Sequence, residues 1–118
     1  MQTQFRHIDA GAPLTVSRGK FRRVTAIDEY PDPSYLDDEA GQERLSAYRN
    51  GSWHLIGIQA AATFLIPHGG HFVTQTVTSP GLWGIESDSD ESYLDDVYAE
   101  ECESLADMLA ALGVTVTD

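Results

Sequence analysis

The stretch WHLIGIQAAATFLI, residues 53–66, is the part of the sequence that decides the fold. Its even-numbered positions form a row that is apolar almost throughout, and such alternation is typical of a β-strand with one buried face. The row consists of His54, Ile56, Ile58, Ala60, Ala62, Phe64 and Ile66. The stretch therefore predicts a long strand, and we interpret His54 as a histidine satisfied within the core.

A second strand is predicted immediately after the first. Residues 67–70 read Pro-His-Gly-Gly, which are turn residues, and residues 71–78 alternate again between two sets of side chains. The two strands are therefore expected to form a hairpin. Residues 79–81, Ser-Pro-Gly, predict a further turn, which leaves residues 82–85 as a connector.

The clearest helix lies in the second half of the chain. Apolar side chains recur there at spacings of 4, 4, 3, 4 and 3, which keeps them on one side of a helix. They are Leu94, Tyr98, Cys102, Leu105, Leu109 and Leu112, with Val97 and Met108 widening the stripe. Gly113 fits the left-handed position after a helix end, and residues 114–117 are compatible with a short edge strand.

The first half of the chain is less regular. Residues 1–19 are expected to be irregular because glycine and proline interrupt every run, and residues 20–28 are interpreted as a strand. The prolines at positions 31 and 33 then require a turn, because each fixes its own φ and restricts the residue before it.

Two helix starts share one pentapeptide. The sequence Ser-Tyr-Leu-Asp-Asp begins at Ser34 and again at Ser92, and in each case a serine and an acid three residues later resemble a capping box. The first copy predicts a helix that an Asn-Gly pair ends near Arg49. We interpret the repeat as two independent caps rather than a duplicated half.

The predicted elements follow the order β, α, β, β, α, with an optional last β. This order favours an α+β fold with a mostly antiparallel sheet of three to four strands, packed by two helices on one face. The length of 118 residues is typical of one domain, so residues 1–118 are expected to form a single domain.

The distribution of charge is the most informative feature for function. Residues 1–49 contain eight acidic and seven basic side chains, whereas residues 50–118 contain eleven acidic and no basic ones. Ten of the eleven lie between Glu86 and Asp107. Because a block of one sign opposes compaction through self-repulsion, its presence suggests a surface that meets a positively charged partner.

An acidic stripe is predicted on the helix face opposite the apolar one. It consists of Asp96, Glu100, Glu103 and Asp107, and it is extended by Asp95, Glu86, Asp88, Asp90 and Glu91. A row of carboxylates at this spacing resembles a diluted phosphate backbone, and the alternative is an ordinary solvated face. Trp83 is the next candidate for an interface anchor, because aromatic residues often dominate binding energy.

Few residues of the sequence are candidates for catalysis or for holding a cofactor. His68 and His71 at the hairpin tip are metal candidates that lack a third nearby ligand, and residues 88–99 fail the EF-hand pattern at positions 6 and 12. Cys102 lies on the apolar stripe, and no phosphate-binding, hydrolase or metalloprotease motif is present. The sequence therefore predicts a protein that is not an enzyme and that needs no cofactor.

The remaining charges restrict the partner. The only basic cluster, Arg18, Lys20, Arg22 and Arg23, is expected to protect a sheet edge or to pair with the protein's own acids. Direct binding to nucleic acid or to an anionic membrane is disfavoured for a chain of net charge −12. With one cysteine, no apolar run long enough for a membrane span and no signal peptide, the chain is expected to be cytoplasmic.

Residues 79–94, SPGLWGIESDSDESYL, and the acidic helix after them resemble small acidic proteins of bacteriophages and integrated mobile elements. The resemblance covers about a third of the chain and implies a genomic setting rather than an activity. By analogy, it favours an inhibitor that blocks a host defence enzyme by mimicking DNA.

Four hypotheses follow for the function. The first is a non-enzymatic interaction protein that presents its acidic face to a basic surface, such as that of a nucleic-acid-binding protein. The others are an antitoxin or immunity protein for a basic toxin, a metal-dependent hydrolase built around the two hairpin histidines, and a structural protein. A homodimer is compatible with each of them.

Overall fold

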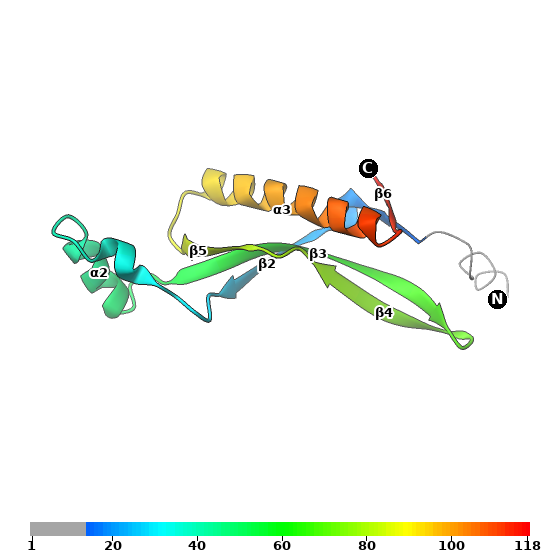
Figure 1. The fold of residues 1–118 in the computed structure, drawn as a ribbon, viewed down its shortest axis with the longest axis horizontal. Coiled ribbons are helices and arrows are strands. Elements are labelled where there is room, and N and C mark those ends of the chain that lie inside the picture. Colours follow the sequence, from blue (N-terminus) through cyan, green and yellow to red (C-terminus); the bar gives the residue numbers. More distant parts are fainter. Residues whose placement is uncertain (1–13) are drawn as a thin grey trace.

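The structure is a computed structural model, and it describes residues 14–118 of the chain. It confirms an α+β fold with a mostly antiparallel four-stranded sheet and two α-helices. Helix α3 (Glu91–Ala111) lies along one face of the sheet, and helix α2 (Gln42–Arg49) lies at one end of the molecule (Figure 1). The molecule is elongated, with extents of 66 × 25 × 20 Å.

Strand β3 (Leu55–His68) is the centre of the sheet, as the sequence predicts. Strand β2 (Arg22–Ile27) pairs with one edge of β3, whereas β4 (His71–Thr78) and β5 (Leu82–Glu86) share the opposite edge. The expected connector at residues 82–85 is therefore wrong, because these residues pair with β3 as a strand. The β3–β4 hairpin is confirmed, and its outer half projects away from α2 (Figure 1).

Burial divides β3 into two parts. Seven of its first eight residues are buried, which exceeds the single buried face that the alternation predicts, whereas Thr63 and Leu65 in its outer half are exposed. The interpretation of His54 as a core residue is wrong, because its side chain is exposed just before the strand begins. Trp53 occupies the buried position instead, with 2% of its surface exposed.

Helix α3 packs on β3 through the predicted apolar stripe. Leu94, Val97, Leu105 and Leu109 are buried, and Tyr98 contacts both of the apolar clusters that form the core. Leu112 is an exception, because it caps the helix end and is 67% exposed. Gly113 adopts a positive φ after the helix and Val114 is buried, as predicted.

The first predicted helix is divided in two. A short 3₁₀-helix, η2 (Pro33–Leu36), precedes α2, and its cap is Asp32, whose carboxylate accepts from the backbone N–H of Ser34. The predicted cap at Ser34 is therefore wrong. The two helices are separated where Gly41 packs so closely on the backbone of Leu36 that an added Cβ would lie 2.3 Å from its carbonyl oxygen.

The serine at position 92 is not a cap either, because α3 begins at Glu91 and its N-cap is Asp90, which makes no side-chain capping hydrogen bond. In both places the observed N-cap therefore lies two residues before the predicted one.

The start and the end of the described chain meet in a small second sheet. Strand β1 (Thr15–Ser17) pairs in parallel with β6 (Thr115–Thr117), and a single 3₁₀ turn, η1 (Arg18–Lys20), leads into β2. The prediction of irregular structure up to residue 19 is wrong from Thr15 onward, and residues 1–13 lie outside the described part. The predicted last strand exists, but it pairs with β1 instead of joining the main sheet.

Candidate acidic interface

The predicted acidic residues do lie on the surface of α3 and of the loop before it. All are exposed except Glu86, which is half-buried. They are Glu86, Asp88, Asp90, Glu91, Asp95, Asp96, Glu100, Glu103 and Asp107. Exposure alone does not make them equivalent, because arginines from the first half of the chain neutralise part of the set.

Two residues of the basic cluster, Arg18 before β2 and Arg23 within it, pair with α3. Arg18 contacts Glu103 at 2.7 Å, and Arg23 contacts Glu91 at 3.4 Å and Asp95 at 3.2 Å. This confirms the predicted pairing with the protein's own acids for Arg18 and Arg23, whereas Arg22 donates to the hydroxyl of Thr63. The sequence could not identify the partners, because the paired residues are 68 to 85 positions apart.

Arg44 of α2 holds the loop between β5 and α3. Its guanidinium hydrogen-bonds to Glu86 at 2.8 Å and to both carboxylate oxygens of Asp88, and it stacks over the ring of Trp53 at 4.0 Å. The Arg44 hydrogen bonds lower the pKa of Asp88. The Tyr35 hydroxyl donates to Glu86, and burial, followed by this bond, raises the pKa of Tyr35 to about 12. These contacts tie the loop between β5 and α3 to α2.

Glu101, which is absent from the predicted set, faces inward. Its carboxylate accepts from the hydroxyl of Ser79 at 2.7 Å and from the backbone N–H of Gly81 at 2.9 Å. It therefore fastens the turn between β4 and β5 to α3. The spacing contains the signal, because Glu101 is seven residues after Leu94 and four before Leu105, on the apolar side of the helix.

Four of the predicted acids have no ion pair within residues 14–118. Asp96, Glu100 and Asp107 lie on the exposed side of α3, and Asp90 lies at its start. Along the helix axis the first two are about 6 Å apart and the next about 10.5 Å further on, at about 1.5 Å per residue. These side chains are the uncompensated face of α3, and we use this name below for Asp96, Glu100 and Asp107.

A second acidic region escaped the sequence interpretation. Between Arg23 and Arg44 the chain contains seven acids and no base, and none of the seven forms an ion pair with a described residue. They are Asp28, Glu29, Asp32, Asp37, Asp38, Glu39 and Glu43. We call this region, residues 28–43, the acidic loop. The net charge of residues 1–49 does not reveal it, because the seven bases of the same half balance its seven acids.

Trp83, the predicted anchor, lies on β5 and is 41% exposed. Its ring packs directly over Gly57 of β3, where an added Cβ would lie 2.0 Å from a ring carbon. Its indole N–H donates to the carbonyl oxygen of Pro80 at 3.0 Å. The side chain is thus held in place and lines a cleft beside the acidic loop.

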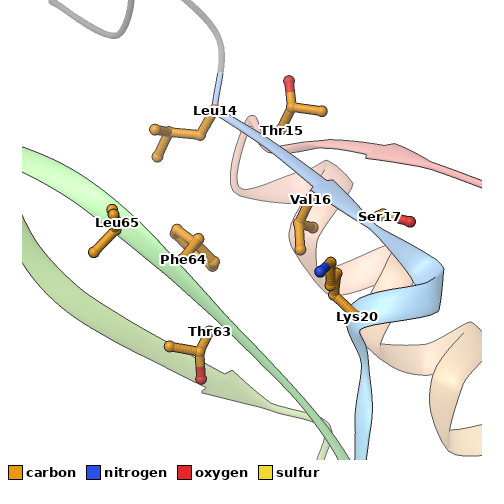
Figure 2. A pocket seen from close by; sticks show the side chains of 8 residues that line it. All are labelled: Leu14, Thr15, Val16, Ser17, Lys20, Thr63, Phe64 and Leu65. Carbon is orange, nitrogen blue, oxygen red and sulfur yellow. The ribbon is translucent and has the colours of Figure 1, made fainter. Parts of the chain in front are cut away.

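A groove separates β1 from the outer half of β3 (Figure 2). Leu14, just before β1, and Val16 of β1 lie opposite Phe64 and Leu65 of β3, and the volume of the groove is about 670 Å³. Lys20 lies at its edge and is the only titratable side chain among the lining residues. Among the described residues, this groove therefore supplies no acid–base pair.

The remaining candidates occupy separate places. His68 and His71 face one another at the hairpin tip, both exposed, and within the described chain no group of three potential ligands gathers around a metal site. Cys102 belongs to α3 and is half-buried. Burial, followed by the nearby Cys102 side chain, raises the pKa of Tyr98 to about 12. No helix within residues 14–118 is both long enough and apolar enough to cross a membrane.

Comparisons of the chain with family models, with curated proteins and with solved structures gave no match.

Proposed function

We propose that this chain is a non-enzymatic interaction protein that binds a basic surface of a partner protein through the uncompensated face of α3. The observation that carries the proposal is the contrast along one helix. Glu91, Asp95 and Glu103 are paired with arginines, whereas Asp96, Glu100 and Asp107 are exposed and without a counterion among the described residues. Exposed carboxylates of one sign attract a basic partner and accelerate its encounter.

The packing of α3 on the sheet makes the uncompensated face suitable as a binding surface. Leu105 and Leu109 have no exposed surface, so α3 is anchored to the sheet on the side opposite the acids. A rigid helix loses little conformational freedom when it binds, which favours affinity.

The partner class includes nucleic-acid-binding proteins, such as the host defence enzymes suggested by the resemblance to phage proteins. Carboxylates about 6 and 10.5 Å apart are sparser than phosphates about 3.4 Å apart. We therefore propose recognition of a basic surface in general, with DNA mimicry as its narrower form.

The test is capture of bacterial proteins on the immobilised chain, followed by salt elution and by competition with duplex DNA. We expect a captured basic protein to be released as ionic strength rises, because exposed charges are screened within about 8 Å at physiological salt. The variant Asp96→Asn/Glu100→Gln/Asp107→Asn should fail to capture it. A partner that is retained in high salt and by this variant would contradict the proposal, and release by DNA would support the narrower form.

A further inference from the structure

A second surface, next to the acidic loop, has the features of a docking cleft. It has a volume of about 500 Å³ and is lined by Ala26, Ile27, Asp28, Glu29, Tyr30 and Trp83. Its large apolar and aromatic side chains are open to solvent: Ile27 is 68% exposed and Tyr30 is 89% exposed. Exposed aromatic residues around a concavity are typical of protein interfaces.

One aromatic wall of the cleft, Trp83, is held in place, and the backbone that carries the other, Tyr30, is tied to the sheet. Trp83 is fixed by its packing on Gly57 and by its hydrogen bond to Pro80. The backbone N–H of Tyr30 donates to the carboxylate of Asp28 at 2.9 Å, and the N–H of Asp28 donates to the carbonyl of Leu55 at 3.0 Å. These bonds tie the start of the acidic loop to the sheet.

The charged side chains that line the cleft are all negative. Asp28 and Glu29 supply two carboxylates, and neither has a basic partner within residues 14–118. The five further acids of the acidic loop follow without an intervening base. An aromatic cleft with carboxylates on its lining is complementary to a side chain that is both flat and positively charged.

We propose that this cleft binds an arginine side chain of a basic partner. A guanidinium stacks on an indole ring and at the same time donates to carboxylates from its edge, which an ammonium group does less well. This inference deepens the proposed function, since it assigns a second contact to the same kind of partner. It uses none of the α3 acids.

The experiment is an NMR titration of the whole chain with the peptide acetyl-Gly-Arg-Gly-Arg-Gly-amide. We expect saturable shifts of the Trp83 indole N–H and of Tyr30. Citrulline is a neutral isostere of arginine, so the same peptide with citrulline in place of arginine should leave both signals in position. Trp53 is an internal control, because its buried indole donates to the carbonyl of Arg44.

Two variants sharpen the titration. Tyr30→Ala and Glu29→Gln alter exposed side chains and leave the core intact. Each should weaken peptide binding about two- to fivefold, the equivalent of one exposed cation–π or charge contact. Unchanged affinity in both variants, or equal binding of the citrulline peptide, would overturn the assignment.

The triple variant of α3 separates this inference from the proposed function. Asp96→Asn/Glu100→Gln/Asp107→Asn should still show the Trp83 shift, because the cleft lies elsewhere. If the peptide shifts only α3 signals in the parent protein, the cleft inference is wrong and the proposed function stands. If Trp83 shifts and the triple variant still captures the basic partner fully, the α3 proposal is wrong and the cleft remains.

Discussion

The two acidic regions of this molecule differ in what lies beside their carboxylates. Around α3 and the loop before it, five acids are paired with Arg18, Arg23 and Arg44. In the acidic loop, seven acids have no ion pair within the described residues, although the bases lie in the same half of the chain. Position in the sequence is therefore a poor guide to local charge, because folding carries the arginines to distant acids.

The two acidic regions also differ in how many buried residues hold them in place. Helix α3 places five buried residues against the sheet, whereas only Gly41 is buried between residues 28 and 43. An acid on α3 is therefore held at a fixed place, and an acid in the loop relies on local hydrogen bonds such as those of Asp32 and Asp38.

The largest expected effect is on stability, and it concerns the packing of α3 on the sheet. Leu105→Ala should lower the free energy of unfolding by about 2 to 5 kcal/mol, because it leaves a cavity under α3. Leu112→Ala is the matched control, since Leu112 on the same helix is 67% exposed, and it should change stability by about 0.5 kcal/mol or less. Urea unfolding measures both. Equal destabilisation by the two variants would mean that α3 is not anchored as described.

The second effect concerns the one acid on α3 that faces inward. Glu101→Ala should cost about 1.5 to 3 kcal/mol, because it removes the charged acceptor of Ser79 and Gly81. Glu100→Ala, one residue earlier and exposed, should be close to neutral. Thermal melting of the two variants checks this, and a Glu101 variant as stable as the Glu100 variant would exclude the described role of Glu101.

The smallest effect concerns the dependence of stability on pH. Because Arg44 lowers the pKa of Asp88, the unfolded state takes up a proton on that carboxyl before the folded state does. The stabilisation is therefore present above a pH of about 3.9 and is lost as the pH falls through the folded-state pKa.

Arg44→Gln should weaken this acid dependence, whereas Glu43→Gln, which removes a charge from the same helix, should keep it. Unfolding in urea between neutral pH and about pH 3 is the measurement. The assignment fails if the parent and the Arg44 variant lose stability in parallel.

Much of the fold follows from local pattern. The alternation in residues 53–66, the Gly-Gly turn and the helical stripe predict β3, the hairpin and α3, because each depends on the period of the side chains. The division of the first helix was not predictable in this way, because Asp32 and Asp38 offer the backbone competing hydrogen bonds. The sequence did not predict strand β5, because its five residues, with a glycine at the centre, are too few to show the alternation of side chains that is typical of a strand.

The candidate site was predictable only in part. The exposed positions of the α3 acids follow from helical spacing, and the same spacing places Glu101 inward. The arginine pairs join residues that are 42 to 85 positions apart, and no local pattern records such distances. The cleft at Trp83 depends on the contact between β5 and Gly57 of β3. This contact joins residues that are distant in the sequence, so it could be identified only from the structure.

The central claim is that carboxylates without counterions make the interface, and carboxylates paired within the protein do not. It is tested by the affinity of an isolated basic partner for two variants, each of which loses three carboxylates from α3. One is Asp96→Asn/Glu100→Gln/Asp107→Asn. The other is Glu91→Gln/Asp95→Asn/Glu103→Gln combined with Arg18→Gln and Arg23→Gln, so that no arginine is left unpaired.

We expect the first variant to bind about tenfold more weakly than the parent, since three exposed contacts of about 0.5 kcal/mol each amount to about 1.5 kcal/mol, and a tenfold change in affinity corresponds to about 1.4 kcal/mol. The second variant should bind within about twofold of the parent, because the pairs it removes were already neutralised within the protein. Equal losses in the two variants, with both folded by circular dichroism, would contradict the claim.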